Sequence, residues 1–371
     1  MAENVIVGAG LAGMVAAINL AREGRDVLVL EGERRVGGSA VYHPSPGGTP
    51  VDPRALAAYT GIDISEAVAP MQKGIAVVYG ELIPIDAEAI SAYMIERGPR
   101  SSSLDSYLYE LAVREGVRFE FNHPLVSNDD FMELPPDSVI ATGLYFEAFD
   151  AIRVPYRTSF HFTARQSIPD TASNHVTIYH GSFTGDYGYT CSINGVQFAH
   201  VFQRTPIGRD TLKAFEEQVF TSEGIEFKEW AHFTSPVPAA TIKNPRLFAG
   251  DKLLAGSIGG YQEPYMFFGM LGALVSGKIA AIAVADRARA LAEFKLATSA
   301  FRGAYLLSRV VGVTIHPLRR TGLSIGLKRL VHDSLGARVL KQSMPGWKNC
   351  QAKGVSLSQR KSGVRSQNLN L

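Results

Sequence analysis

The 371-residue sequence is poor in cysteine. Its two cysteines, Cys191 and Cys350, lie far apart and form no CxxC pair, so a disulfide framework is excluded and a reducing, cytoplasmic compartment fits. His175 and His180 are five positions apart on an expected strand and therefore point to opposite faces. They do not form a metal pair, and we predict no metal.

The N-terminus lacks a basic stretch before its apolar residues, which argues against a secretory signal peptide. One apolar run, Phe267–Ala285, is long enough to span a bilayer. Lys278 lies in the middle of that run, where a charge is costly in lipid. We therefore expect a buried helix of a soluble protein there, with a membrane span as the alternative.

What the sequence does contain is a glycine motif at its N-terminus, between an apolar strand and a helix pattern. In a dinucleotide site the first glycine allows a tight turn, the second lets the backbone approach a pyrophosphate, and the third lets the helix pack closely. The helix N-terminus offers free N–H groups to the phosphates. The alternative is a tight turn that binds nothing. The motif comprises Gly8, Ala9, Gly10, Leu11, Ala12 and Gly13.

Glu31 ends the second strand, 18 residues after Gly13, where an acid accepts hydrogen bonds from ribose hydroxyls. Three further segments place glycine just past a strand. The sequence shows no second glycine fingerprint, so a separate nicotinamide domain is not expected. The three segments are Arg35-Val36-Gly37-Gly38, Ala141-Thr142-Gly143 and Gly256-Ser257.

Taken together, these segments resemble the geranylgeranyl reductase family, within the p-hydroxybenzoate hydroxylase-type FAD fold. Leu253–Ala281 resembles the family's strand, loop and helix beside the flavin, and Thr177–Val201 resembles its substrate strands. The resemblance covers roughly residues 3–290 and implies FAD as cofactor, with NAD(P)H or a reduced carrier protein as electron donor. It also implies cofactor contacts at the motif residues above, at Arg100 and at Gly269.

The expected fold class is α/β, with a Rossmann-type FAD-binding domain, a second, largely antiparallel β substrate domain, and a helical basic C-terminus. We assign the FAD-binding domain to 1–60, 98–150 and 245–290, and the substrate domain to 61–97 and 151–244. Residues 291–350 form the C-terminal helical region and 351–371 a disordered tail. The flavin sheet is predicted at about 3–7, 27–31, 117–122, 138–142 and 252–255, with helices at about 11–23, 103–115 and 265–286. The second sheet is predicted at 75–79, 83–85, 175–179, 187–192 and 196–202, with an Asn194-Gly195 hairpin turn.

The chain departs from the family pattern in three places. Ser257 replaces the usual aspartate, and a neutral hydroxyl is a weaker partner for the ribityl hydroxyls. The Asp-Gly motif that hydroxylases carry after the Ala-Thr-Gly strand is absent, which weakens the hydroxylase interpretation. The cysteine that many geranylgeranyl reductases carry after the Gly-Gly pair is also absent, so cysteine-dependent chemistry is not expected.

The leading hypothesis is redox chemistry at a carbon–carbon bond of a hydrophobic lipid or isoprenoid substrate. Alkene reduction needs a proton donor and the reverse desaturation needs a base, and the sequence leaves the direction open. For each candidate side chain, packing or capping is the competing interpretation. An NAD(P)H-dependent monooxygenase on an aromatic or apolar substrate and a non-catalytic flavin- or lipid-binding protein remain alternatives. The candidates are Tyr261, Glu263, Tyr265 and His43.

The C-terminal part is strongly basic, with 11 Lys and Arg and a single acid, Asp333, from Arg319 onward. Apolar and basic residues alternate over 318–341, which indicates docking of a helix at an anionic membrane surface or, equally, packing of the helix on the body. The first interpretation predicts a cytoplasmic protein held at the inner face of the membrane. No nucleic-acid motif accompanies the charge, so no nucleic-acid partner is expected.

Overall fold

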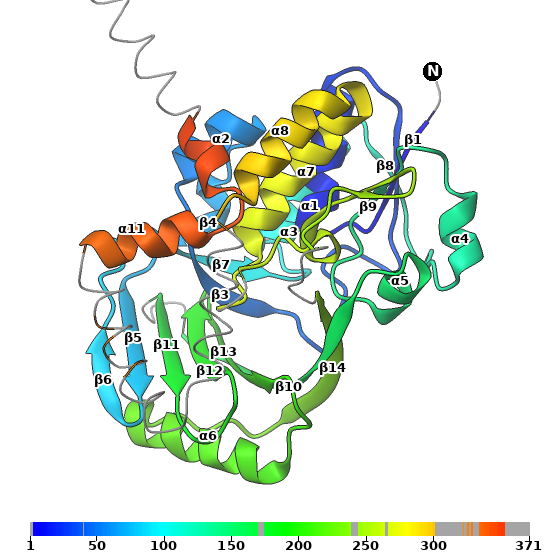
Figure 1. The fold of residues 1–371 in the computed structure, drawn as a ribbon. Helices are drawn as coiled ribbons and strands as arrows, with labels where there is room; N and C mark the ends of the chain where they lie inside the picture. The colour runs from blue at the N-terminus through cyan, green and yellow to red at the C-terminus, as the bar shows by residue number, and fades with distance from the viewer. Residues whose placement is uncertain are drawn as a thin grey trace, which may run out of the picture.

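A computed structural model of the chain describes residues 3–39, 41–169, 174–238, 244–263, 266–300 and 334–352, and positions 322, 325 and 328. Its described elements are built around two large sheets (Figure 1). Helices α1, α7 and α8 lie with the first sheet at one end of the molecule, and helix α6 lies beneath the second at the other end. Tyr265 and most of 301–333 fall outside the described residues.

The nucleotide-binding half holds a six-stranded sheet in the order β15-β16-β9-β1-β2-β8. Only the pair β15–β16 is antiparallel. β2 is apolar throughout, and β1 is apolar after Asn4, because both faces of the sheet are covered. The five predicted strands are confirmed, although β8 and β9 are shorter than expected, and β15 was not predicted. The strands are β1 (Asn4–Val7), β2 (Val27–Leu30), β8 (Arg118–Glu120), β9 (Val139–Ile140), β15 (Phe248–Ala249) and β16 (Lys252–Leu254).

Helix α1 (Leu11–Arg22) packs closely on helix α7 (Met270–Ala285). A Cβ placed on Gly277 would overlap the carbonyl oxygen of Ala12. Lys278 donates from Nζ to Oδ1 of Asn19 at 2.6 Å, so the charge in the apolar run binds a polar side chain of α1. Across the described residues, no helix has the length and apolarity needed to cross a membrane. The remaining helices on this half are α2 (Pro53–Thr60), α3 (Leu104–Arg114), α4 (Asn128–Glu133), α5 (Phe146–Ala151) and α8 (Arg287–Ala297).

The second sheet has seven strands in the order β14-β10-β13-β12-β11-β5-β6. All neighbours are antiparallel except β11 and β5. The predicted hairpin turn at Asn194-Gly195 is confirmed, with positive φ at both residues. The strands are β5 (Lys73–Val78), β6 (Glu81–Pro84), β10 (Tyr156–Ser167), β11 (His175–His180), β12 (Tyr187–Ile193), β13 (Val196–Gln203) and β14 (Trp230–Pro238).

Strands β10 and β14 are absent from the sequence prediction. On β10 the buried positions include polar side chains, Ser159, His161 and Thr163, while Phe160 and Phe162 are less buried. Polar residues thus occupy the buried positions and apolar residues the less buried ones, so the alternation of the sequence does not indicate a strand with an apolar buried face. β14 carries prolines at 236 and 238, which an edge strand tolerates because its outer N–H groups need no partner.

The two faces of the second sheet have different neighbours. Helix α6 (Arg209–Glu223) covers one face, where Phe215 and Val219 pack against Tyr179 and Val201 (Figure 1). The opposite face looks toward the nucleotide-binding half. A third sheet, β3 (Ser45–Pro50), β7 (Ala92–Arg97) and β4 (Val68–Pro70), lies between the two halves and pairs segments from both sides of the predicted boundary at residue 60. The exact domain boundaries stay a prediction.

The described part of the C-terminal region packs on the body. Helix α11 (Ser334–Ser343) buries Ala337 and Leu340, and Trp347 follows it into the core. Lys341 donates from Nζ to the carbonyl oxygen of Ala89 at 2.8 Å, and Lys328 forms an ion pair with Glu81. These contacts fit the packing interpretation of the basic segment. The rest of 318–341 and the predicted tail from 353 lie outside the described residues.

Candidate functional site

The glycine loop after β1 and the start of α1, residues 8–13, leave open space on one side. We call this loop, together with the segments that lie against it, the cradle. Gly8 has a φ of +100°, and a Cβ on it would lie 2.6 Å from the carbonyl oxygen of Ala141. A Cβ on Gly13 would overlap the carbonyl oxygen of Gly8. Close packing therefore requires both glycines. A Cβ on Gly10, in contrast, would have no described atom within 4 Å, so free space lies on that side of the loop.

The N-terminus of α1 is free to receive an anion. Gly10 is its N-cap, no side chain among the described residues caps the helix, and its first turn contains no acidic residue. Leu11 and Ala12 are buried below this end. N–H groups without intrahelical partners and the helix dipole both favour a phosphate here.

Glu31 lies at the end of β2 beside this loop. Its carboxylate accepts the N–H of Ala9 at 2.6 Å and that of Glu33 at 2.8 Å. Burial raises the pKa of Glu31, and these two backbone hydrogen bonds oppose that effect only in part. Each oxygen of a carboxylate can accept more than one hydrogen bond, so Glu31 retains capacity for ribose hydroxyls.

The end of β9 completes the first side of the cradle. β9 pairs with β1, which brings Ala141, Thr142 and Gly143 next to Gly8. Oγ1 of Thr142 is buried and finds no hydrogen-bond partner in the described part of the chain. Such an atom is costly unless a ligand or water satisfies it. Gly143 has a φ of +71° and open space around its Cβ position.

The segment Gly256-Ser257 lies beside the start of α1. A Cβ on Gly256 would lie 3.2 Å from the Cβ of Ala12, and its N–H donates to Oγ of Ser276 at 2.8 Å. Oγ of Ser257 lies 3.9 Å from the Cβ position of Gly269, which is the N-cap of α7. The structure therefore brings together two chain segments that the sequence predicted to bind one cofactor.

Other predicted cofactor residues have structural partners. A Cβ on Gly37 would overlap the backbone of Gly98, and one on Gly38 would lie 2.8 Å from the carbonyl oxygen of Arg35, so the glycine pair allows a close chain crossing. Arg35 is exposed. Arg100 donates from Nη2 to the carbonyl oxygen of Asn194 at 2.9 Å and pairs with Glu96 at 3.3 Å. Arg100 thus joins the two halves, and its cofactor contact stays a prediction.

Two of the candidate proton donors, Tyr261 and Glu263, are buried in the nucleotide-binding half. Tyr261 is fully buried in the core and stands edge-on to Phe294, with ring centroids 5.9 Å apart. Glu263 is also buried, and its carboxylate accepts the N–H of Met266 at 2.5 Å, which closes a tight turn. Oη of Tyr261 is buried and finds no hydrogen-bond partner among the described residues, so the proton-donor roles of Tyr261 and Glu263 stay predictions. Tyr265 lies outside the described residues.

His43 lies nearer the interface of the two halves. Its Nδ1 is 2.7 Å from Oγ of Ser45. Burial, followed by the positive charge of Arg97, lowers the pKa of His43 to about 4. The imidazole is therefore neutral at pH 7, and it accepts or donates a hydrogen bond according to its tautomer.

Sequence reasoning missed an aromatic face on the second sheet. The face lies opposite α6 and receives Tyr42 from the loop after the Gly-Gly pair. Tyr42 is half-buried, and its ring contacts rings of β13 and β14 at centroid distances of 5.6 to 5.9 Å. Aromatic residues scattered over 42–233 carry no local signal of this arrangement. We define the aromatic face as Tyr42, Tyr187, Tyr189, Phe198, His200, Phe202 and Phe233.

Within this face, two histidines and a serine form a buried chain. His161 Nδ1 lies 2.9 Å from His200 Nε2, and His161 Nε2 lies 2.9 Å from Ser235 Oγ. Burial lowers the pKa of His161 to about 4, and it lowers the pKa of His200 further below its ordinary range. Both imidazoles are therefore neutral near pH 7.

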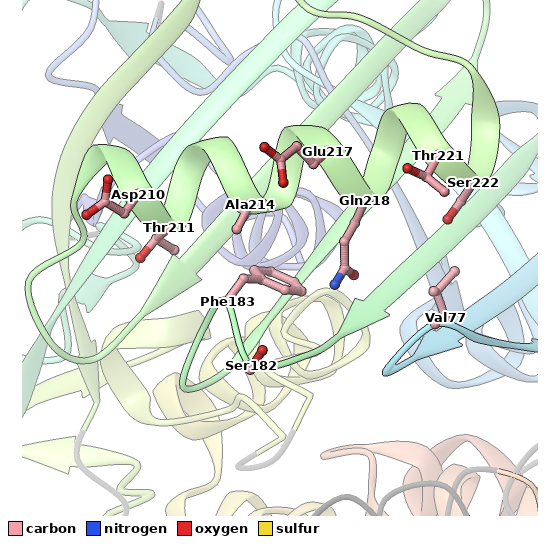
Figure 2. A pocket seen from close by; sticks show the side chains of 11 residues that line it. Val77, Ser182, Phe183, Asp210, Thr211, Ala214, Glu217, Gln218, Thr221 and Ser222 are labelled. Carbon is pink, nitrogen blue, oxygen red and sulfur yellow. The ribbon is translucent and has the colours of Figure 1, made fainter.

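A separate pocket of about 650 Å³ lies between α6 and the face of the second sheet that α6 covers (Figure 2). Asp210, Glu217 and Gln218 line it from the helix, with Gln218 pointing toward Phe183, and Phe183 and Val77 line it from the sheet side. The sheet separates this pocket from the cradle. No group of three or more His, Cys, Asp or Glu side chains suited to a metal occurs among the described residues.

Comparisons with known proteins agree with this geometry. A family model for an NAD(P)-binding Rossmann-like domain matches residues 6–71. The flavin-containing monooxygenase FMO GS-OX2 of Arabidopsis thaliana is 51% identical over 47 residues, which are 13% of this chain and 10% of that protein. A putative relative, FMO GS-OX-like 11 of the same plant, is 41% identical over 59 residues, 15% of this chain and 35% of that protein. The matches thus span between a tenth and about a third of these relatives.

Solved structures match over almost the whole chain. A geranylgeranyl bacteriochlorophyll reductase-like protein from Thermoplasma acidophilum has a TM-score of 0.62 at 14% identity, covering 95% of this chain and 96% of that one. p-Nitrophenol 4-monooxygenase from Pseudomonas putida has a TM-score of 0.59 at 14% identity, covering 94% and 99%. HpxO R204Q from Klebsiella pneumoniae, solved with FAD, has a TM-score of 0.58 at 17% identity, covering 94% and 99%.

The chain therefore has the α/β fold of FAD-dependent oxidoreductases with a Rossmann-type nucleotide-binding domain. The prediction of this fold is confirmed, and two solved proteins that share it, CtdE and HpxO R204Q, contain FAD. The described residues fit that cofactor at three points: the space beside Gly10, the uncapped N-terminus of α1, and the unpaired Oγ1 of Thr142. At identities of 14–17% the structural matches establish the fold alone.

Proposed function

We propose that this protein is an FAD-dependent oxidoreductase acting on an apolar substrate held between the cradle and the aromatic face. The observation that carries the proposal is the meeting of the glycine loop with the late segment at Gly256 and Ser257. It leaves open space at Gly10 beside an uncapped helix. A fold that bound no dinucleotide would have no need of this combination.

In this proposal the N–H groups of the first turn of α1 hold the pyrophosphate, and Glu31 holds a ribose. Thr142, Ser257 and the N-terminus of α7 supply the remaining polar contacts. FAD, when bound, supplies two-electron redox chemistry. The N-terminus of α7 favours negative charge nearby, so it stabilises the reduced, anionic form.

The leading reaction is reduction of a carbon–carbon double bond, or the reverse desaturation. Its support is the apolar, ring-lined face and the fold shared over 95% of the chain with a geranylgeranyl bacteriochlorophyll reductase-like protein. Rings and methylenes bind such substrates by excluding water, with few polar groups needed for orientation.

The second candidate is a monooxygenase on an aromatic or apolar substrate. Two observations favour it: the local sequence matches are to flavin-containing monooxygenases, and p-nitrophenol 4-monooxygenase shares the fold over 94% of the chain. The two reactions differ in their need for oxygen, which makes them separable by experiment.

The cofactor proposal is tested with Gly10→Ala. The new Cβ points into open space in the ligand-free chain, so we expect unchanged thermal unfolding of the flavin-free protein. It would stand where the backbone must approach the pyrophosphate, so we expect FAD binding to weaken by roughly tenfold or more. Gly47→Ala, which also has open space but lies in β3, is the control. Equal FAD affinity of both variants and wild type would reject the site.

The reaction is tested by reducing the bound flavin without oxygen and adding a geranylgeranyl lipid in detergent. Return of the oxidised flavin spectrum would identify the alkene as electron acceptor. Incorporation of ¹⁸O from ¹⁸O₂ into product would instead establish a monooxygenase. Lipid that binds, yet leaves both reduced and oxidised flavin unchanged, would leave the third alternative, a non-catalytic flavin- and lipid-binding protein.

We further propose contact with an anionic membrane surface through residues 318–341. The charge from Arg319 onward is the support, although Lys328 and Lys341 contact the body. Each basic residue near an anionic surface contributes about 1 kcal/mol. Replacing Arg319, Arg320, Arg329 and Arg338 by Gln is therefore expected to abolish co-sedimentation with phosphatidylglycerol vesicles. Unchanged co-sedimentation would exclude this surface.

A further inference from the structure

The imidazole of His200 has one buried nitrogen that nothing in the described chain satisfies. His200 is 6% exposed, and its Nδ1 has no hydrogen-bond partner there. Its other nitrogen, Nε2, is bound to His161 at 2.9 Å. A buried polar atom without a partner costs roughly 1–3 kcal/mol, so a ligand that satisfies it gains affinity.

The hydrogen-bonded chain Ser235–His161–His200 allows Nδ1 of His200 to be either a hydrogen-bond donor or an acceptor. If Nδ1 of His161 donates to His200, then His200 carries its own proton on Nδ1, and Ser235 donates its hydroxyl to His161. If Nε2 of His200 donates instead, its Nδ1 is a bare acceptor and His161 donates to Ser235. Both states satisfy the other atoms of the chain, so Nδ1 matches a carbonyl or a hydroxyl.

The surroundings of His200 are flat rings. Tyr42 and Tyr189 stand edge-on to it at centroid distances of 5.6 and 5.3 Å, and Phe202 lies at 5.1 Å. Tyr42 comes from a loop of the nucleotide-binding half, and Thr163 binds the same loop by donating from Oγ1 to the carbonyl oxygen of Val41 at 3.1 Å. The Tyr42 hydroxyl lies a long 3.4 Å from that of Tyr189.

We propose that His200 Nδ1 is the polar anchor for a planar, unsaturated ring bearing one hydroxyl or carbonyl group, and that Tyr42 covers this anchor until the ligand displaces it. The Tyr42 side chain is itself a planar ring with one hydroxyl, and it packs against rings of β13 and β14. A ligand of the same shape would make the same ring contacts in its place. The inference names a substrate class for the second candidate function, the oxidoreductase acting on an aromatic substrate, and rests on that function, but ligand binding is measurable without turnover.

The test compares p-cresol with toluene by isothermal titration calorimetry on the purified protein with its bound flavin. Toluene is the more hydrophobic of the two, so apolar burial alone favours it. One satisfied hydrogen bond reverses this order, and we expect p-cresol to bind about fivefold more tightly than toluene. His200→Phe keeps a ring and is expected to remove the preference, whereas Tyr189→Phe, which removes a hydroxyl from the same face, is expected to keep it.

Two further measurements test the inference even if His200→Phe does not fold. In the wild-type protein labelled with ¹⁵N-histidine, p-cresol is expected to shift the Nδ1 resonance of His200, and toluene is not. Tyr42→Ala is expected to raise p-cresol affinity about tenfold, because the cover is gone. Equal binding of both probes, or an Nδ1 resonance unmoved by p-cresol, overturns the inference even when FAD content is normal. Absence of FAD instead rejects the proposed function, and the same two probes titrated into the flavin-free protein then test the ring site by itself.

Discussion

Arg97 and Asp105 form a two-pronged ion pair between the end of β7 and the start of α3. Nε of Arg97 lies 2.7 Å from Oδ2 of Asp105, and Nη2 lies 2.8 Å from Oδ1. The N–H of Gly98 adds a bond to Oδ2 at 2.8 Å. Burial opposes ionisation of Asp105, but the Arg97 guanidinium and these hydrogen bonds outweigh burial and hold the pKa of Asp105 below its usual range.

Asp105→Asn is therefore expected to lower the free energy of unfolding by roughly 2–3 kcal/mol. This is less than the ~3–5 kcal/mol of a fully buried pair, because the Arg97 side chain is 30% exposed. Urea denaturation at pH 7 measures the change. Glu115→Gln breaks the more exposed pair with Arg22 and is the control, with an expected loss below about 1 kcal/mol. Equal losses in the two variants would contradict the prediction.

The crossing of α1 and α7 leaves no room for a side chain at Gly277. An added methyl would overlap the carbonyl oxygen of Ala12, and backbone cannot move as a side chain can. Gly277→Ala is expected to destabilise the protein by about 1–3 kcal/mol and to lower its FAD content, because Ala12 belongs to the cradle. Differential scanning calorimetry and flavin absorbance measure both effects. Unchanged stability would show that the helices cross differently.

Two buried histidines predict an acid-sensitive fold. The pKa values of His43 and His161 are lowered to about 4 in the folded state, first by burial. The unfolded chain, with pKa values near 6.5, binds more protons between pH 6.5 and 4, so folding stability falls as the pH falls through this window. Each group contributes up to about 1.4 kcal/mol per pH unit.

Urea titrations at pH 7, 6 and 5 measure this slope. The double variant His43→Asn, His161→Gln is expected to lose less stability between pH 7 and pH 5 than wild type. If the double variant keeps the wild-type slope, the two imidazoles are not the groups that titrate.

Ser257 offers a gain-of-function test of the cofactor site. Its hydroxyl lies near the N-terminus of α7, where a carboxylate would be favoured. Charge-assisted hydrogen bonds are about twice as strong as neutral ones. Ser257→Asp is therefore expected to tighten FAD binding by roughly fivefold, and Ser257→Ala to weaken it, as measured by fluorescence titration of the flavin-free protein. Tightening by both variants would place Ser257 away from the cofactor.

Parts of the site that depend on neighbouring residues in the sequence were predictable. Gly8, Gly10 and Gly13 act within one turn, and the apolar strands on either side are short, continuous runs. The Gly37-Gly38 pair was also visible, and the structure adds a reason for it, a close crossing of the chain with Gly98. A sequence pattern shows that a small residue is needed, but not which backbone approaches it.

The sequence by itself determined the Rossmann-type fold and the cradle, because turn, helix and strand signals there are local. Only the tertiary structure decided the ring site. His161 and His200 are 39 positions apart, and they meet because Thr163, two residues after His161, pairs with His200 across β10 and β13. Tyr42 joins them from a loop of the other half. Such contacts follow from strand register and from packing between halves, and no local pattern encodes either.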